Sequence, residues 1–395
     1  MLTRLVTAVL ALMLAAAEAA LAVPASGTPY ELPAIVPSTG GGAFLAKSYL
    51  ETFRAIERLV NATGGIQGQP LKIVPLDSQT TGQVGLQLAN KFVGKDAVFI
   101  DGGPSTVCNA IVPLVVKSGP VDFCLSPLIH PPAGSYVFSA SVASYDSTKV
   151  GIRYFRARGW KRIAIVASTD ASGQDYENQT NAVLQLPENK RVQIVARAHF
   201  APADLSVSAQ ISRVKASAPQ AILVYATGTP VATALRAIAE SGLDVPVQIP
   251  TSNAIYTQLA TYKAFLPKQL FFSTVLALTP GAIPPGPIRE VQRKYFQAFK
   301  AIGSRPDFAH NLAWDPTMIV VDALRHLGTH ATAEQIRDYI LHLHGWVGIN
   351  GVYDFGGGDQ RGIGENAAEV AQWNAATDTW VRASAARGYL IADKK

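Results

Sequence analysis

Short apolar runs alternate with helical patterns along most of the chain. Seven runs rich in Val, Ile and Phe predict strands, at residues 71–77, 97–103, 121–126, 162–168, 192–200, 221–228 and 245–250. Between them, apolar residues recur every three or four positions, as in a helix with one buried face; examples are Leu45, Tyr49, Phe53, Ile56 and Val60. Because the strands are apolar at nearly every position, helices should cover both faces of their sheets. The alternation predicts an α/β fold with parallel sheets.

The loops that follow these strands are rich in Ser, Thr and Gly, and several come directly before a helix. Parallel sheets bind their ligands at the carboxyl ends of the strands. Free backbone N–H groups at the start of a helix favour an anion or a carbonyl oxygen. We therefore expect the ligand-binding residues in six loops, at 37–43, 102–107, 126–134, 168–175, 226–230 and 250–256.

No motif for nucleotide binding or hydrolysis is complete. The consecutive glycines at 40–42 lack the third glycine of a dinucleotide-binding loop, and no Gly-Lys-Ser or Gly-Lys-Thr follows them. No Gly-x-Ser-x-Gly elbow surrounds any serine. Asp77, Asp101 and Asp122 lie near strand ends, but no pairing in the sequence makes two of them a general acid and base. The sequence therefore predicts neither an enzyme nor a bound cofactor.

Metal binding is not predicted either. His342 and His344 lie two residues apart, an offset that places them on different faces of a helix, so we expect them at a helix end. Cys108 and Cys124 are the only cysteines. In an exported protein they could form one disulfide, and the alternative is two buried thiols. The sequence leaves both open, because it defines neither their distance nor their orientation.

Composition and charge narrow the class of protein. The chain has 395 residues, of which 48% are hydrophobic and 16% charged, and this is typical of a globular protein with two or three domains. Its net charge of +6 is spread along the chain without a basic run. Nucleic-acid binding is therefore not expected.

The amino terminus has the features of a secretory signal. Arg4 precedes an apolar stretch that starts at Leu5, and Ala20 and Ala22 fit an A-x-A cleavage site. The alternative is an uncleaved anchor, which would need about 20 apolar residues to span a bilayer, more than this stretch offers. We predict a cleaved signal peptide at residues 1–22 and a soluble mature protein in the periplasm.

The order of motifs resembles the periplasmic solute-binding proteins of branched-chain amino-acid ABC transporters. Residues 38–81 are similar to the opening of that family, including its Asn-x-x-Gly-Gly-Ile-x-Gly turn at 61–68. Residues 102–127 resemble the family's Gly-Pro-x-Ser helix and the Ser-Pro loop that follows. Further similarity lies at 202–243, 314–328 and 348–360.

The resemblance implies the type I periplasmic binding protein fold, in which two Rossmann-like α/β lobes with parallel sheets are joined by three crossover strands. Lobe one is expected at 27–144 plus 275–349, and lobe two at 145–274 plus 350–395. A small-molecule solute would bind in the cleft between the lobes, which close about a hinge. The protein would then deliver the solute to an ABC permease in the inner membrane, as a monomer and without catalysis, cofactor or metal.

The family's binding positions can be transferred residue by residue. Ser105 matches a serine that holds the ligand carboxylate, and His130 ends a loop in which the family has small residues followed by Thr. His130 could donate a hydrogen bond to an anionic ligand, or it could be a structural residue bonded to a carbonyl group. Ser172 replaces a tyrosine. The binding site implied by the resemblance comprises Thr39, Phe44, Ser105, Thr106, Leu128, Ile129, His130, Ser172, Thr229 and Asn253.

One departure from the family concerns the amino group of the ligand. Amino-acid-binding members have an acidic residue in the loop that aligns with 250–256, where this chain has Thr251, Ser252 and Asn253. A buried ammonium group without a carboxylate is costly. We therefore expect an aromatic acid or another small carboxylate rather than an ordinary amino acid. The alternatives are a genuine branched-chain amino-acid binder, a ligand sensor of the same fold that acts on a receptor, and an exported enzyme with a titratable pair in the cleft.

Overall fold

The computed structural model describes residues 24–392, and its core consists of two sheets that belong to two lobes. The first lobe is built on a five-stranded parallel sheet in the order β2-β1-β3-β4-β5. Its strands are β1 (Tyr30–Val36), β2 (Leu71–Asp77), β3 (Phe99–Gly102), β4 (Val121–Cys124) and β5 (Val137–Phe138).

Helices cover both faces of this first sheet. On one face, α2 packs against α10 and α11, and α12 contacts β4. On the other face, α3 and α4 pack against each other over a smaller apolar cluster. A short antiparallel hairpin, β11 with β12, lies beside α10. The bounds are α2 (Ala43–Ala62), α3 (Gly82–Val93), α4 (Ser105–Val115), α10 (Pro287–Ala301), α11 (Phe308–Leu327), α12 (Ala333–Leu341), β11 (His344–Val347) and β12 (Val352–Asp354).

The second lobe is built on a seven-stranded sheet in the order β14-β13-β10-β9-β8-β6-β7. Strands β6 to β10 are parallel, while the pairs β10–β13 and β13–β14 are antiparallel. The strands are β6 (Arg162–Ser168), β7 (Gln193–Phe200), β8 (Ala221–Tyr225), β9 (Val247–Ile249), β10 (Leu270–Val275), β13 (Ala368–Asn374) and β14 (Thr379–Arg382).

Five helices accompany the second sheet. Helices α5 and α6 pack together on β10, β6 and β8, while α7 and α8 pack together on β7 and β8. Every residue of β8 is buried, as expected for a strand covered on both faces. The helices are α5 (Ser144–Ala157), α6 (Ala171–Leu184), α7 (Ser208–Ala216), α8 (Thr229–Glu240) and α9 (Tyr256–Tyr262).

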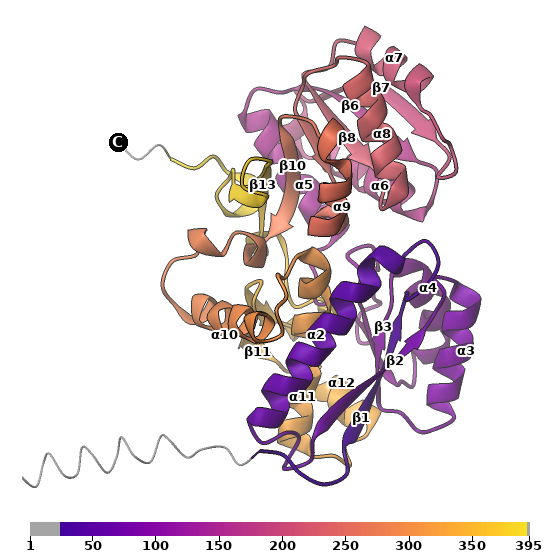
Figure 1. Cartoon of the computed structure of the whole chain (residues 1–395), viewed down its shortest axis with the longest axis vertical. Coiled ribbons are helices and arrows are strands. Elements are labelled where there is room, and N and C mark those ends of the chain that lie inside the picture. The colour runs from indigo at the N-terminus through magenta and orange to yellow at the C-terminus, as the bar shows by residue number, and fades with distance from the viewer. Residues whose placement is uncertain (1–23, 393–395) are drawn as a thin grey trace, which may run out of the picture.

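The chain passes between the two lobes three times within the described residues: after β5, after β10 and after β12 (Figure 1). The second passage, at 276–286, contains most of the Pro-rich stretch between β10 and α10. Before the third passage, the hydroxyl of Tyr353 donates to Asp315 Oδ2 over 2.8 Å, and the Phe355 ring lies 6.0 Å from that of Phe138. The segment through Phe355 thus packs on the first lobe, a few residues beyond the boundary at 349 that the resemblance implied.

The predicted α/β fold with two lobes and parallel sheets is confirmed. All seven predicted strands form, and the expected helix after the first loop is α2. Strands β1, β5, β10, β11, β12, β13 and β14 were not predicted. Strand β5 has only two residues, and β13 carries Glu369 and Gln372 among its apolar residues, so the apolar pattern is weak there. The described residues contain no helix that is long and apolar enough to span a membrane, and the predicted signal peptide at 1–22 lies outside them.

Candidate functional site

A cavity of about 240 Å³ lies between the two lobes, at the carboxyl ends of their strands. Loops that precede helices and loops that follow strands form its walls, as the pattern of Ser, Thr and Gly indicated. The first lobe contributes Gly41, Gly42, Phe44, Leu45, Thr80, Pro104, Ser105, Thr106, Leu125, Ser126, Pro127, Leu128 and Leu312, and the second contributes Asp170, Ala171, Ser172, Thr227 and Ser252.

Two helices of the first lobe begin at this cavity without a side-chain cap of their own. Helix α4 starts at Ser105, and the preceding Pro104 has no side-chain acceptor to offer. Helix α2 starts after Gly42, whose N–H donates to Thr80 Oγ1 over 3.0 Å. The N-cap of α2 is Gly42, and no side chain, including those of Ser38 and Thr39, caps its first turn. Uncapped N–H groups and the helix dipole make this wall attractive to an anion.

The second lobe presents a carboxylate to the same cavity. Asp170 is the N-cap of α6, and its Oδ1 accepts hydrogen bonds from the backbone N–H groups of Ser172 and Gly173, each over 3.0 Å. The hydroxyls of Ser168 and Ser172 donate to the same oxygen over 2.9 and 2.7 Å. Asp170 is the one charged side chain among the described residues that line the cavity. The wall formed by the second lobe therefore carries a negative charge, whereas the lining residues of the first lobe are uncharged.

Apolar side chains also line the cavity, between these polar walls. Phe44 extends from the first turn of α2 to the loop after β8. A Cβ atom added to Gly228 would lie 3.2 Å from Phe44 Cε1, and Gly228 has a φ of +76°, so glycine suits this close approach. The other large apolar side chains that line the cavity are Leu45, Leu125, Leu128 and Leu312, all from the first lobe.

Five of the ten residues chosen from the sequence line the cavity: Phe44, Ser105, Thr106, Leu128 and Ser172. Sequence reasoning missed several others. The most informative of these is Asp170, which lies two residues before Ser172 in a loop that had already been selected. An Asp directly before a helical pattern is a typical N-cap signal, and this signal could have placed a carboxylate at the site.

The other five chosen residues lie outside the cavity. Thr39 donates to Asp77 through its N–H and its hydroxyl, over 3.1 and 2.8 Å. Ile129 is buried in the apolar cluster under α4, and Thr229 is the first residue of α8. Asn253 is fully buried and accepts from the N–H of Gly228 over 3.0 Å, so it shapes the loop rather than touching the cavity.

His130 forms a hydrogen bond across the lobes. Its Nε2 lies 2.9 Å from Asp175 Oδ1, which belongs to α6 of the second lobe. Burial by itself would raise the pKa of Asp175, but the hydrogen bonds from His130 and Gln179 contribute to a net lowering of that pKa. Two roles were considered for His130. The structure shows its ring bonded to a protein side chain, and this partner is a carboxylate rather than a carbonyl group.

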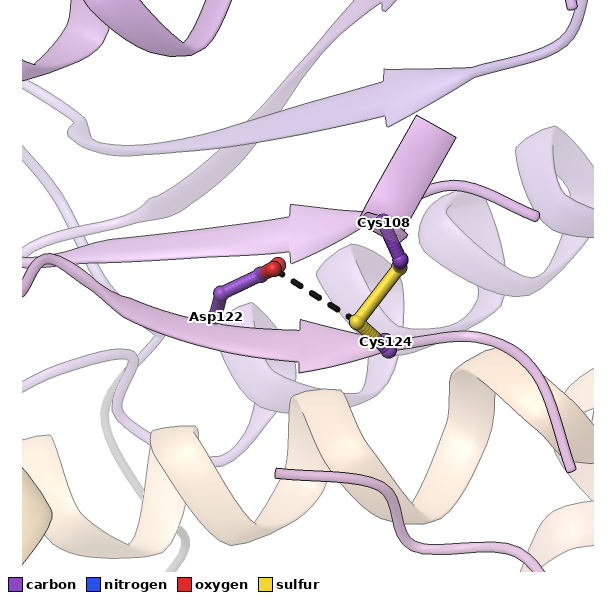
Figure 2. Close-up of side chains that lie close together, drawn as sticks. All are labelled: Cys108, Asp122 and Cys124. Atoms are coloured by element: carbon purple, nitrogen blue, oxygen red, sulfur yellow. Dashed lines mark hydrogen bonds between the residues drawn. A yellow bond between two sulfur atoms is a disulfide. The ribbon is translucent and has the colours of Figure 1, made fainter. Parts of the chain in front are cut away.

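Cys108 and Cys124 form a disulfide, with their Cα atoms 5.8 Å apart. Figure 2 shows the bridge between α4 and the end of β4, with the Asp122 side chain beside Cys124. Burial raises the pKa of Asp122 to about 7. Because a disulfide sulfur carries no hydrogen, Asp122 can form a hydrogen bond across the 3.5 Å between its Oδ2 and Cys124 Sγ only when it is protonated.

These three residues are also the one group of three potential metal ligands that comes together in the described part of the chain. With both sulfurs in the disulfide, neither is available as a thiolate ligand. His342 follows the last residue of α12, and His344 begins β11, where its ring bonds to Asp354 over 2.8 Å. The two histidines are thus at a helix end and a strand start.

Comparison with known proteins agrees with this architecture. The profile of the family described as periplasmic binding protein matches residues 29–378. The chain belongs to this family. The resemblance to leucine-binding-type periplasmic proteins inferred from the sequence is thereby confirmed.

Solved structures share the fold of this periplasmic binding protein at low sequence identity. An extracellular ligand-binding receptor from Rhodopseudomonas palustris HaA2 superposes with a TM-score of 0.80 at 18% identity, over 90% of this chain and 100% of that one. A leucine-binding protein LivK from Thermotoga maritima gives 0.72 at 18% identity, over 87% and 94%. The substrate-binding protein LivJ from Streptococcus pneumoniae, in complex with isoleucine, gives 0.73 at 14%, over 93% and 98%. None of the curated proteins searched matches the sequence.

Proposed function

We propose that this periplasmic binding protein captures a small organic carboxylate in the cavity between its lobes and delivers it to an ABC-type permease of the inner membrane. The observation that carries the proposal is the first-lobe wall, where α2 and α4 begin without side-chain caps beside an apolar surface. Such a wall suits the carboxylate of a solute whose body is apolar or aromatic.

The charge around this wall supports an anionic group. The described residues of the first lobe that line the cavity include no Asp or Glu. Behind them, the buried Arg361 guanidinium donates to the carbonyl oxygen of Pro127 over 3.2 Å and to Ser139 Oγ over 3.1 Å. Arg361 forms no ion pair with a described carboxylate, and burial lowers its pKa to about 10. It therefore adds positive potential next to a lining residue, offset in part by the nearby carboxylates of Asp359, Asp146 and Asp175.

Transport is supported by family membership and by the secretory signal predicted at 1–22. Two similar structures are a leucine-binding protein and an isoleucine complex, so a branched-chain amino acid is the second candidate ligand. Asp170 favours that candidate. The loop at 250–256 has no acidic residue that could pair with an ammonium group, but Asp170 at the start of α6 is such a residue. A ligand sensor of the same fold that acts on a receptor is a further alternative.

The proposal can be tested on the purified mature protein with a panel of benzoate, 4-hydroxybenzoate, phenylacetate, leucine and isoleucine. A ligand at about 100 times its dissociation constant stabilises a protein by about 2.7 kcal/mol, which thermal unfolding detects readily. We expect at least one carboxylate of this panel to raise the melting temperature, with calorimetry giving its affinity. If none of these acids binds and the solute that copurifies with the native protein carries no carboxylate, the proposal is wrong.

Ser105→Ala tests the location of the carboxylate. Ser105 is the first residue of α4 and lines the cavity, so its hydroxyl can donate to the bound anion. Loss of one such hydrogen bond to a charged group should weaken binding about tenfold or more. Ser206→Ala, on an exposed turn of the second lobe, is the control and should bind as the wild type does. Equal affinity of the two variants would place the carboxylate elsewhere.

A further inference from the structure

We propose that Cys108, Asp122 and Cys124 form a zinc site in chains that fold with both cysteines reduced, and that the disulfide takes its place in chains that fold oxidised. This site is separate from the solute cavity and does not depend on the proposed function. The proposal follows from a buried carboxyl group that lies beside two sulfur atoms and whose Oδ1 has no partner in the described part of the chain (Figure 2).

The three side chains converge from two elements of the first lobe. Asp122 and Cys124 lie two residues apart in β4, so both point to the same face of the sheet. Cys108 meets them from α4, which covers that face. One potential ligand atom from each residue lies within 4.8 Å of the other two. A tetrahedral zinc ion, with bonds of about 2.0–2.3 Å, requires ligand atoms about 3.5–4 Å apart. Small side-chain rotations are therefore sufficient once the sulfurs are not joined.

The Asp122 carboxyl group is not used by the bridged form of the protein. Its side chain is fully buried, and its Oδ1 has no hydrogen-bond partner among the described residues. Its Oδ2 lies 3.5 Å from Cys124 Sγ. A buried polar atom without a partner destabilises a fold. A cation bound between this carboxylate and the two sulfurs would be the missing partner.

Gly102 provides the room that a bound ion needs. It pairs with Cys124 in the neighbouring strand β3. A Cβ atom added to Gly102 would collide with Asp122 Oδ1 and would lie 3.2 Å from Cys108 Sγ. Any side chain at this position would therefore crowd two of the three ligands. The carbonyl oxygen of Gly103 lies 3.2 Å from Cys108 Sγ and can act as a fourth ligand.

The ligand set selects the class of ion. Thiolates favour zinc and softer ions, whereas Mg²⁺ and Ca²⁺ take oxygen ligands. Two thiolates and a carboxylate around a divalent ion leave one negative charge in excess. Cys108 lies close to the N-terminus of α4, where the helix dipole favours negative charge and stabilises a thiolate. We therefore expect Zn²⁺ to bind.

Burial makes the choice between bridge and ion a matter of how the chain folds. Cys108 is 0% and Cys124 1% exposed, so the folded protein shields both sulfurs from reagents. When a reduced chain binds Zn²⁺, each thiol gives up its proton to solvent, as does Asp122 where it is protonated, and no electrons are transferred. On the oxidising route, a disulfide reagent takes up the two electrons and two protons that the thiols lose.

The test uses the untagged mature protein, unfolded in denaturant with a phosphine reductant and refolded without oxygen in the presence of Co²⁺, a spectroscopic substitute for Zn²⁺. We expect a single Co²⁺ ion per chain, with the thiolate-to-cobalt charge-transfer absorption and the visible bands of tetrahedral cobalt. Zn²⁺ should displace it, as its higher affinity for such sites requires. Protein refolded oxidised is the control and should show neither absorption. A reduced protein that refolds without them overturns the proposal.

Asp122→Asn tests the carboxylate ligand. Loss of a residue that merely supports a metal ligand costs about 10–100-fold in affinity, so loss of a ligand should weaken Co²⁺ binding by at least tenfold. Asp101→Asn is the matched control, because Asp101 is equally buried on the neighbouring strand but faces the other side of the sheet. It should bind Co²⁺ as the wild type does. Equal affinity of the two variants would overturn the role of Asp122.

Cys108→Ser keeps the test conclusive if Asp122→Asn fails to fold, which thermal unfolding checks. This variant retains one thiol, so its charge-transfer absorption should be at most half that of the reduced wild type. An undiminished absorption would mean that the cobalt ion lies elsewhere, and the proposed site would then be wrong.

Discussion

At the scale of single residues, burial of carboxyl groups is the most unusual feature of the first lobe. Asp101 and Asp122 are fully buried on the neighbouring strands β3 and β4. Asp122 pairs with Ile100 in the register, so Asp101 and Asp122 face opposite sides of the sheet and do not meet as an acid and base. Burial raises the pKa of Asp122 to about 7 and, with a smaller effect of the Asp122 charge, that of Asp101 to about 8.

These shifts predict that the protein loses stability as the pH rises. The pKa of Asp122 in the unfolded chain is about 3.9, below its folded value of about 7. The folded state therefore holds a proton more tightly, and the stability this provides is present below about pH 4 and is lost as the pH approaches 7. In Asp122→Asn, the difference in unfolding free energy between pH 5 and pH 8 should shrink by on the order of 2 kcal/mol.

Urea unfolding at both pH values measures this difference. Asp244→Asn, which changes an exposed carboxylate, should keep the pH dependence of the wild type. An Asp122→Asn protein with an unchanged pH dependence would mean that Asp122 is ionised in the folded state.

At the scale of secondary-structure elements, the disulfide joins two segments that line the cavity. Cys108 lies one turn after Ser105 in α4, and Cys124 directly precedes the segment from Leu125 to Leu128. The bridge therefore fastens the start of α4 to the loop after β4. This arrangement should hold the start of α4 and the loop after β4 in place before the solute arrives, which lowers the cost of ordering them on binding.

Replacing both cysteines by serine should weaken stability and binding together. The bridge spans 16 residues in the sequence, and a disulfide that closes a loop of about 15 residues contributes roughly 3 kcal/mol. Denaturant unfolding of the Cys108→Ser/Cys124→Ser protein should show a loss of this order, and the affinity for the best carboxylate should fall. Wild-type protein that is reduced and kept reduced is the control and should behave like the variant. An unchanged affinity would show that the two segments are held by packing alone.

At the scale of the whole molecule, the lobes touch at several points. Among these contacts are Phe44 against Gly228, the hydrogen bond of His130 with Asp175, and the backbone hydrogen bond from Phe308 to Ala254. The His130 side chain is 56% exposed and that of Asp175 only 16%. A pair of this kind contributes little to folding stability, but as a contact between two rigid lobes it bears directly on how tightly they close.

His130→Ala should shift the lobes towards an open arrangement. The pair is worth up to about 1 kcal/mol, so the closing equilibrium should change by no more than about fivefold. Small-angle X-ray scattering should report a larger radius of gyration for the variant without added solute. The matched control is His199→Ala, which removes a similar pair with Glu177, at 2.7 Å, within the second lobe. A radius unchanged by His130→Ala, or equally changed by both substitutions, would contradict a role in closure.

The local pattern of residues was sufficient to predict the order of most elements. The apolar spacing from Leu45 to Val60 corresponds to α2, and the continuous apolar run at 221–225 corresponds to β8. Both are periodicities of neighbouring residues, which the backbone geometry of helices and strands imposes. The same logic located the loops that carry the cavity, because loops at the carboxyl ends of parallel strands meet at one edge of a sheet.

By itself, the sequence thus determined the fold class, the family and the loops of the site, because each depends on short-range periodicity or on motifs read along the chain. Only the tertiary structure decided which side chains of those loops meet. It brought Asp170 to the cavity, turned His130 towards Asp175 and joined Cys108 to Cys124. The reason is physical: these contacts depend on how two separately folded lobes and their crossing segments are placed in space, which no local pattern records.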